Sequence, residues 1–298
     1  MECLVMEYIE PGNLKHYLKQ YNRKEGRRTE DQMTMKRLIK MCADIADGMM
    51  FLSEKEVVHR DLAARNCLVS KAPGAPYETV KICDFGMTRE LDIEEFSAVN
   101  KMPYYVPTEA NFGEFPLRWW PPEAIEPPNK FTTESDIWSY GVLLYEIGSL
   151  GETPYGTEEN GEIKKRLSKD RARVQEYNVL CKNEWRKLII DNLGFLGISE
   201  KDTERYIIGL IQTCCVYEIA KRPDFQQILR RIDEIAEYGD LAKYEDEYYF
   251  FSERDELIKE EMNEFEMEKS TFFIEDEEKS TDIDEEINEQ NDKKPLLP

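Results

Sequence analysis

The stretch His59-Arg60-Asp61-Leu62-Ala63-Ala64-Arg65-Asn66 decides the fold, and Asp84-Phe85-Gly86 follows it along the chain. Before the octet, apolar residues recur at three- and four-residue spacing from Met35 to Leu52, which predicts an amphipathic helix capped by Thr34. After it, two short apolar runs joined by a Pro- and Gly-rich connection predict a β-hairpin. We therefore expect the octet on a loop between a helix and a hairpin, with Asp84 just past the second strand.

The side chains of this stretch suit one kind of chemistry. Asp61 can accept the hydrogen bond of an attacking hydroxyl group, and Asn66 and Asp84 offer the hard oxygen ligands that magnesium prefers. Arg65 can neutralise charge on a phosphoryl group. Phosphoryl transfer asks little more of a protein, because positioning and charge neutralisation supply most of its catalysis. The pattern indicates phosphoryl transfer.

Three further motifs follow in order, namely Pro116-Leu-Arg-Trp-Trp-Pro-Pro-Glu123, Phe131-Thr-Thr-Glu-Ser-Asp-Ile-Trp-Ser-Tyr-Gly141 and Lys221-Arg-Pro223. Together with the octet and Asp84-Phe-Gly86, they resemble the signature set of receptor-type protein tyrosine kinases, insulin-receptor-like or related. The resemblance covers roughly residues 3–235, and residues 157–203 match it poorly. The alternative of a serine/threonine kinase is disfavoured by Ala63-Ala64-Arg65 and by the first of the three motifs.

The resemblance implies a role for each residue of the catalytic motifs. Asp61 would be the catalytic base, and Arg65 would contact the γ-phosphate of ATP. Asn66 and Asp84 would bind Mg²⁺. The reaction would transfer the γ-phosphate of ATP to tyrosine hydroxyls of protein substrates.

The resemblance also implies a nucleotide site near the start of the chain. Glu7 to Ile9 would be the hinge whose backbone meets adenine, with Met6 at the gatekeeper position. Asn13 would lie near the ribose, and Leu68 would lie beneath the adenine ring. Plain core packing is the alternative for Met6 and Leu68.

Two structural pairings follow from the same resemblance. His59, Phe85 and Asp136 would form the lower part of a hydrophobic and hydrogen-bonded spine. Arg222 would pair with Glu123, the acid that closes the first of the three later motifs.

The expected fold class is mainly α, a protein-kinase-like C-lobe with a short β-hairpin and a hinge strand, followed by an acidic tail. Residues 1–240 would form the kinase domain without a Gly-rich loop or strand Lys, and residues 241–298 a mostly disordered tail. Further helices are predicted at 14–20, 135–150, 158–167, 204–216 and 225–236. The apolar run 3–9 predicts a buried strand, and the charge-rich run 164–173 predicts a solvated helix.

The charge is concentrated at the end of the chain. The 298 residues carry a formal net charge of -22, and residues 241–298 hold 21 acidic and 7 basic residues. So acidic a chain is a poor nucleic-acid binder, because phosphate contacts need Lys and Arg. Such a tail stays solvated, since it cannot bury enough apolar surface to offset the entropy of ordering.

Five tyrosines are candidates for phosphorylation and for recognition by phosphotyrosine-binding adaptors: Tyr104, Tyr105, Tyr244, Tyr248 and Tyr249. Arg60 is the candidate partner of a phosphate on the first two, a hypothesis that phosphopeptide mapping tests. A solvated acidic tail without such a role is the alternative for the last three.

The cysteine pattern and the N-terminus bear on location. Seven cysteines without a CxxC pair predict buried reduced thiols and a reducing compartment. Acidic residues interrupt the N-terminus, so no signal peptide is predicted. The run 207–219 is too short to span a membrane and predicts a core helix. If the full-length protein is a receptor, this chain would lie at the cytoplasmic face of the plasma membrane.

The printed sequence shows no Gly-rich loop and no strand Lys of the family pattern. Those groups cover and neutralise the phosphates, so we predict weak ATP binding and little activity for this chain alone. A calorimetric titration checks this, and micromolar affinity for Mg-ATP would contradict it. The alternative function is a non-catalytic, kinase-like scaffold or binding module.

Overall fold

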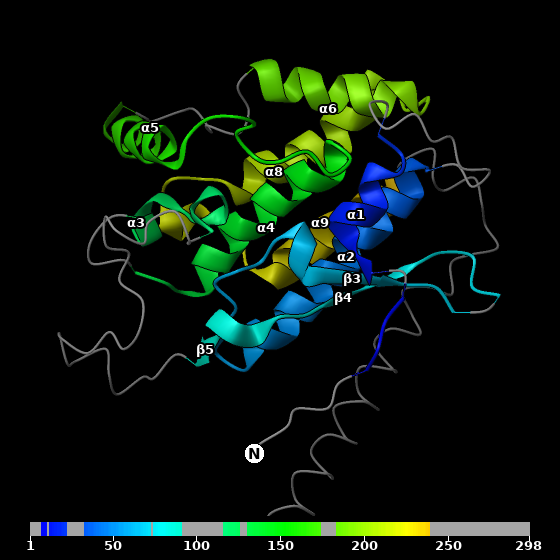
Figure 1. The fold of residues 1–298 in the computed structure, drawn as a ribbon, viewed down its shortest axis with the longest axis horizontal. Coiled ribbons are helices and arrows are strands. Elements are labelled where there is room, and N and C mark those ends of the chain that lie inside the picture. The colour runs from blue at the N-terminus through cyan, green and yellow to red at the C-terminus, as the bar shows by residue number, and fades with distance from the viewer. Residues whose placement is uncertain are drawn as a thin grey trace, which may run out of the picture. The chain divides into compact units, whose positions relative to one another are not determined.

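The computed structural model describes residues 7–10, 12–22, 33–72, 74–90, 116–125, 130–173 and 183–238 (Figure 1). Its helices are α1 Leu14–Lys19, α2 Met35–Glu54, α3 Pro122–Ile125, α4 Thr133–Gly148, α5 Asn160–Arg173, α6 Asn183–Phe195, α7 Glu200–Asp202, α8 Gly209–Cys214 and α9 Phe225–Tyr238. Its strands are β1 Gly12–Asn13, β2 Val57–Val58, β3 Cys67–Ser70, β4 Thr79–Ile82 and β5 Arg89–Glu90. The described part is mainly helical, as the sequence predicts.

Helix α4 lies at the centre of the core and packs against α1, α2, α6 and α8 (Figure 1). Thr132 and Ser135 form a capping box at its start, and every residue from Ser135 to Gly148 is buried. A helix with apolar residues on every face belongs inside a protein, and the buried polar residues of α4, Asp136 and Glu146 among them, need partners there. A Cβ added at Gly141 would lie 2.4 Å from the Cys215 sulfur, so glycine permits the close approach of α4 to the end of α8.

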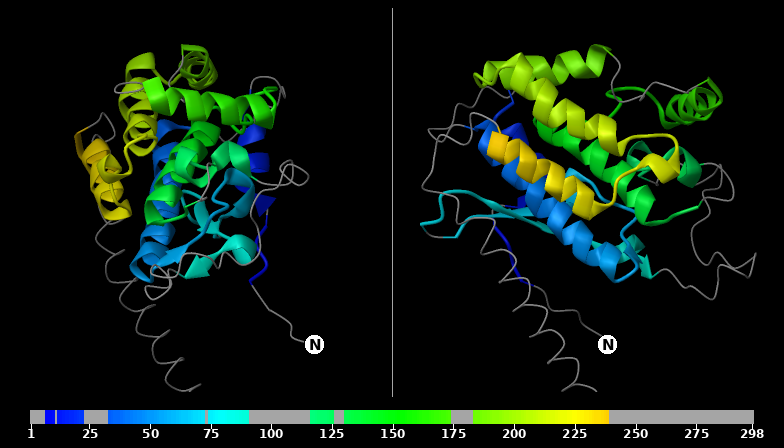
Figure 2. Two further views of the ribbon diagram at one scale, coloured as in Figure 1. Left: turned by 90° about the vertical axis from the view of Figure 1, so that its left-hand side faces the viewer. Right: turned by 180° about the vertical axis from the view of Figure 1, so that it is seen from behind.

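Helix α2 shows the amphipathic pattern that the sequence predicts. The Thr34 side chain accepts a hydrogen bond from the backbone N–H of Arg37 and begins the helix. The buried face of α2 packs against α9 and β4, and Figure 2 shows α2 and α9 side by side. Packing of such a face supplies most of the stability of a helix in a protein.

Two small sheets lie beside the helices. In the first, β1 and β4 flank β3, and all pairs are antiparallel with Asn13 opposite Leu68 and Leu68 opposite Lys81. This confirms the predicted hairpin. In the second, β2 pairs with β5. The predicted strand over 3–9 is not formed at Glu7–Ile9, where the chain pairs with no strand and Tyr8 is 83% exposed; its first part lies outside the described residues.

The poorly matching stretch 157–203 is also ordered in part. The predicted helix appears as α5, with Ile163 and Leu167 buried, whereas α6 was not expected from the sequence. Leu193 of α6 reaches the core, and the Asn192 amide donates to the Ser149 carbonyl at 2.8 Å.

The predicted core helix at 204–216 is a π-helical turn, Thr203–Ile208, continued by α8. Its apolar residues are buried, among them Ile207 and Ile211. No helix in the described ranges is long and apolar enough to cross a bilayer. The tail 241–298 lies outside the described residues.

The described cysteines are free thiols, as predicted. Cys42, Cys67, Cys214 and Cys215 are buried, and Cys83 is half-buried. Burial raises the pKa of the Cys42, Cys67, Cys83 and Cys214 thiols, because a thiolate loses its hydration in the core.

A buried ion pair joins α2 to the connection before β4. Arg37 donates two hydrogen bonds to Glu78, at 2.7 and 3.1 Å, and a third to the Tyr17 hydroxyl at 2.7 Å. Both charged side chains are only 4% exposed. Burial favours the protonated acid, but the hydrogen bonds from Arg37 outweigh it and hold the pKa of Glu78 below its usual value. The pair therefore stays ionised at neutral pH and holds the hairpin against α1 and α2.

Replacing Arg37 by Met is expected to lower the free energy of unfolding by about 3 kcal/mol, because the buried charge of Glu78 would keep only the more exposed Lys71, 3.5 Å away, as its ionic partner. Denaturant unfolding followed by circular dichroism measures the change. Lys165→Met, which removes one partner of an exposed pair with Glu162, serves as the control and should change nothing measurable. An Arg37→Met/Glu78→Leu double variant should recover much of the loss, and equal losses for single and double variants would contradict the electrostatic cause.

Candidate active site

The acidic group of the octet is held by two neighbours on the same loop. Asp61 follows β2, and a 3-10 turn at Ala64–Asn66 brings the next side chains back toward it. Arg65 forms an ion pair with one carboxylate oxygen of Asp61. The Asn66 amide donates to the other oxygen at 2.8 Å and to the Asp61 carbonyl at 2.7 Å. These contacts fix the Asp61 carboxylate in one orientation.

The electrostatics of Asp61 are those of a partly desolvated acid. Burial raises the pKa of Asp61, while Arg65 and the Asn66 hydrogen bond act in the opposite direction without cancelling it. Arg65 itself lies over the Trp119 ring, 4.2 Å from the ring centre. This stacking holds the guanidinium beside the carboxylate.

The turn before Asp61 is bound to the core helix. The Asp136 carboxylate of α4 accepts the backbone N–H of His59 at 2.7 Å and that of Arg60 at 3.0 Å. Burial raises the pKa of Asp136 to about 7, although both N–H donors favour the charged form. Arg60 has a φ of 68°, in the left-handed region that few residues other than glycine adopt.

His59 connects this turn to the Asp84 segment. Its Nδ1 accepts the Asp61 N–H at 3.3 Å, so its Nε2 carries the proton and donates to the Cys83 carbonyl at 3.3 Å. Burial lowers the pKa of His59, which keeps the ring neutral. The ring also packs 5.4 Å from that of Phe85. His59, Phe85 and Asp136 are thus brought together as predicted, with Phe85 still 45% exposed.

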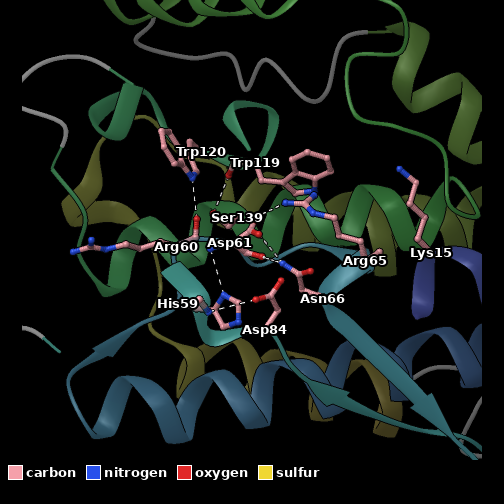
Figure 3. Close-up of polar contacts among 12 residues, drawn as sticks. Lys15, His59, Arg60, Asp61, Arg65, Asn66, Asp84, Trp119, Trp120 and Ser139 are labelled. Carbon is pink, nitrogen blue, oxygen red and sulfur yellow. Dashed lines mark hydrogen bonds and ion pairs between the residues drawn. The ribbon is translucent and has the colours of Figure 1, made fainter. Parts of the chain in front are cut away.

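The two predicted magnesium ligands project into the same region as Asp61 (Figure 3). Asp84 lies in the left-handed region and accepts the Gly86 N–H at 3.4 Å, which aims its carboxylate away from the strand. Because the Asn66 amide nitrogen faces Asp61, its amide oxygen is directed elsewhere. Within the described ranges, no group of three or more His, Cys, Asp or Glu side chains could hold a metal ion. One Asn and one Asp fit magnesium, which binds few protein oxygens and completes its shell with phosphates and water.

Three of the predicted nucleotide residues, Glu7, Asn13 and Leu68, lie in the first sheet or contact it. Asn13 and Leu68 are paired directly across β1 and β3. Glu7 forms an ion pair with Lys81, with Lys81 Nζ 2.7 Å from Glu7 Oε2. Lys81 belongs to β4 and lies opposite Leu68 of β3. The Asn13 side chain accepts the His16 N–H at 2.9 Å and caps α1. Ile9 is half-buried, and Met6 lies outside the described residues.

Glu146 is the site residue that the sequence analysis missed. It is a wholly buried carboxylate near the end of α4. One of its oxygens accepts the Ala64 N–H at 2.8 Å and the Trp119 indole N–H at 2.9 Å, and the other lies 4.0 Å from the Lys15 ammonium. An acid near the end of the apolar run from Val142 to Ile147 was the signal that could have marked Glu146, since buried charges need partners.

The predicted pair near the end of the motif series is also formed. Arg222 makes a bidentate bond to Glu123, at 2.5 and 3.0 Å, and its side chain is completely buried. Arg118 donates to backbone carbonyls at Pro154 and Gly156 and so fastens the 116–125 segment to the loop before α5. All five candidate phosphorylation sites lie outside the described residues.

The family model described as protein tyrosine and serine/threonine kinase matches residues 1–193 of the chain. Among curated relatives, Protein sevenless of Drosophila melanogaster is 37% identical over 182 residues, which cover 58% of this chain and 6% of that protein. The insulin receptor of Xenopus laevis is 31% identical over 294 residues, 95% of this chain and 18% of the relative. Ephrin type-A receptor 1 of Homo sapiens is 32% identical over 232 residues, which cover 78% of this chain and 19% of that protein. The chain spans less than a fifth of the length of each.

The contacts of Glu146 predict a sharp difference between two substitutions. Glu146→Leu leaves the Ala64 and Trp119 N–H groups buried without an acceptor and should lower the free energy of unfolding by about 2–5 kcal/mol. Glu146→Gln keeps an acceptor oxygen and should cost much less. Denaturant unfolding measures both, and similar losses for the two variants would show that packing rather than hydrogen bonding carries the role of Glu146.

Proposed function

Because the chain belongs to the protein tyrosine and serine/threonine kinase family, we propose that it transfers the γ-phosphate of ATP to tyrosine hydroxyls of protein substrates, with low activity for this chain alone because its sequence lacks the Gly-rich loop and the strand Lys. The observation that carries this proposal is the convergence of Asp61, Arg65, Asn66 and Asp84 on one region, on two separate segments of chain (Figure 3). Each group has a chemical task in phosphoryl transfer, and their arrangement requires no further protein nucleophile.

In the proposed reaction the Asp61 carboxylate accepts the hydrogen bond of the substrate hydroxyl and orients its oxygen toward the γ-phosphorus. The new O–P bond forms as the bond to the β,γ-bridging oxygen breaks, ADP leaves, and the hydroxyl proton passes to Asp61. Arg65 lies beside that carboxylate and can neutralise charge on the transferred group. Asn66 and Asp84 would hold Mg²⁺, which would neutralise negative charge on the phosphates when bound.

The adenosine part of ATP is assigned to the first sheet. Asn13 and Leu68, paired across β1 and β3, would contact the ribose and the adenine ring, with the Glu7–Ile9 backbone at its edge. The half-buried Leu68 offers apolar surface to a flat ring. The Glu7–Lys81 pair supports this assignment, because it ties the segment before β1 to β4.

Tyrosine as the acceptor and a receptor setting are supported by the resemblance of the motifs and by relatives named as receptors. We propose that the chain acts at the cytoplasmic face of the plasma membrane as part of such a protein. Phosphorylated Tyr104, Tyr105, Tyr244, Tyr248 and Tyr249 would then recruit phosphotyrosine-binding adaptors.

Asp61→Asn should reduce the single-turnover rate of tyrosine-peptide phosphorylation by about 10²–10⁴-fold, since an amide cannot accept the proton. The structure adds a pH signature. Because the pKa of Asp61 is raised above 3.8, its basic form is lost as the pH falls through a value higher than that of an ordinary Asp. As the pH is lowered, the phosphorylation rate of the unsubstituted chain should therefore begin to fall at a higher pH than it would with an ordinary Asp as the base.

The measurement is peptide phosphorylation with excess chain and saturating Mg-ATP across pH 5–8. The matched control is Asp191→Asn, an exposed acid on α6 remote from the octet, which should leave the rate and its pH profile unchanged. Equal rates for the two variants would remove Asp61 as the base.

A further inference from the structure

The peptide group between Arg60 and Asp61 is held at both ends by side chains. Its carbonyl oxygen accepts the indole N–H of Trp120 at 2.9 Å, and its N–H donates to His59 Nδ1 at 3.3 Å (Figure 3). The peptide group is planar, with its C=O and N–H on opposite sides. Two hydrogen bonds on opposite sides prevent the peptide plane from rotating. The orientation of that plane sets the direction in which the Asp61 side chain projects from the backbone.

The conformation of Arg60 makes this restraint necessary. A left-handed non-glycine residue persists only where its surroundings hold it in place. Asp136 binds the N–H of Arg60 and Trp120 binds its carbonyl, so both backbone polar groups are satisfied by side chains from other segments. Asp136 comes from the core helix, whereas Trp120 comes from the 116–125 segment.

Trp120 is itself rigidly placed. It is 2% exposed, and its ring meets that of Phe131 edge-on, with the centres 5.0 Å apart at 81°. The Arg60 guanidinium lies 5.1 Å from the centre of the same Phe131 ring. The neighbouring Trp119 carbonyl accepts the Ser139 hydroxyl at 2.8 Å, which ties this backbone to α4. An indole held in this way can impose its geometry on the peptide that it binds.

We propose that Trp120 is a positioning residue for Asp61, acting through the Arg60–Asp61 peptide. The bond makes the direction of the Asp61 side chain depend on where the 116–125 segment lies, which couples that segment to the base. The catalytic part of this inference rests on the proposed function. The restraint on the peptide does not, and it can be measured without any reaction.

The test compares Trp120→Phe, which keeps an aromatic ring and removes the N–H donor, with the unsubstituted 298-residue chain. Trp185→Phe is the matched control, because Trp185 packs against Tyr145 and Tyr155 rather than against the octet. NMR on ¹⁵N-labelled chain measures hydrogen exchange at the Asp61 amide and the shift of His59 Nδ1. Exchange should quicken about fivefold in Trp120→Phe, with a change in the Nδ1 shift, and stay the same in the control.

Single-turnover phosphorylation supplies the second readout. In Trp120→Phe the rate constant should fall while the Mg-ATP concentration for half-maximal rate stays constant, because β1 and β3 are untouched. Phe131→Leu, which keeps the donor but removes the ring that orients it, should cause the same changes to a smaller degree, and it replaces Trp120→Phe if that variant fails to fold.

The possible outcomes separate the two proposals. If the Asp61 amide of the folded variants exchanges hydrogen at the same rate as in the unsubstituted chain, the positioning role is overturned, whether or not the chain transfers phosphate. Faster exchange without phosphate transfer by any form supports the restraint and counts against the proposed function. Faster exchange together with a reduced rate and constant half-saturation supports both.

Discussion

One buried carboxylate connects the chemistry of this protein to its core. Asp136 is almost completely removed from water, which costs several kcal/mol for an unpartnered ion. Two backbone N–H groups of the octet offset part of that cost, and their hydrogen bonds to Asp136 fix the turn that carries Asp61. The arrangement works only if α4 is rigid and dry, which explains the capping box at its start and the glycine that lets the end of α8 approach it.

A second buried acid on the same helix completes the support. Glu146 lies ten residues beyond Asp136, about 15 Å along the helix axis. Asp136 binds the first residues of the octet, and Glu146 binds Ala64 near its end. The loop is therefore anchored to one rigid element on both sides of Asp61. Helix α4 therefore fixes the relative positions of the residues that we propose as catalytic.

The sequence predicted those parts of the molecule in which local pattern and tertiary packing agree. The spacing of apolar residues predicted α2, and the cap at Thr34 was readable because a hydroxyl residue preceded the pattern. The mostly apolar composition predicted α4 at 135–150, within two residues of its bounds at each end. The hairpin of β3 and β4 followed from two apolar runs around a turn-rich connection. The pair of Arg222 and Glu123 was predicted through resemblance to a family, and spacing alone does not reveal a contact between residues so far apart.

The remaining features depend on partners that no local pattern names. A strand needs a partner strand to hydrogen-bond with, so the predicted strand over 3–9 is not formed at Glu7–Ile9. The pairing of β2 with β5 was not predicted. Helix α6 has only a weakly amphipathic sequence and owes its place to contacts such as that of Asn192 with Ser149. The sequence could mark Glu146 as a buried acid, but it could not show which groups Glu146 and Trp120 bind, because each binds a backbone group of a distant segment.

The described cysteines differ in burial, so an alkylating reagent reaches them at different rates. Cys42, Cys67, Cys214 and Cys215 lie in the core, where burial suppresses the reactive thiolate, so an alkylating reagent reaches them only when the helices separate. Cys83 is half-buried and directly precedes Asp84, so its alkylation responds to smaller openings around the site. Among the described cysteines, alkylation of Cys83 would therefore report local opening around Asp84, and alkylation of the four core thiols would report unfolding of the helical core.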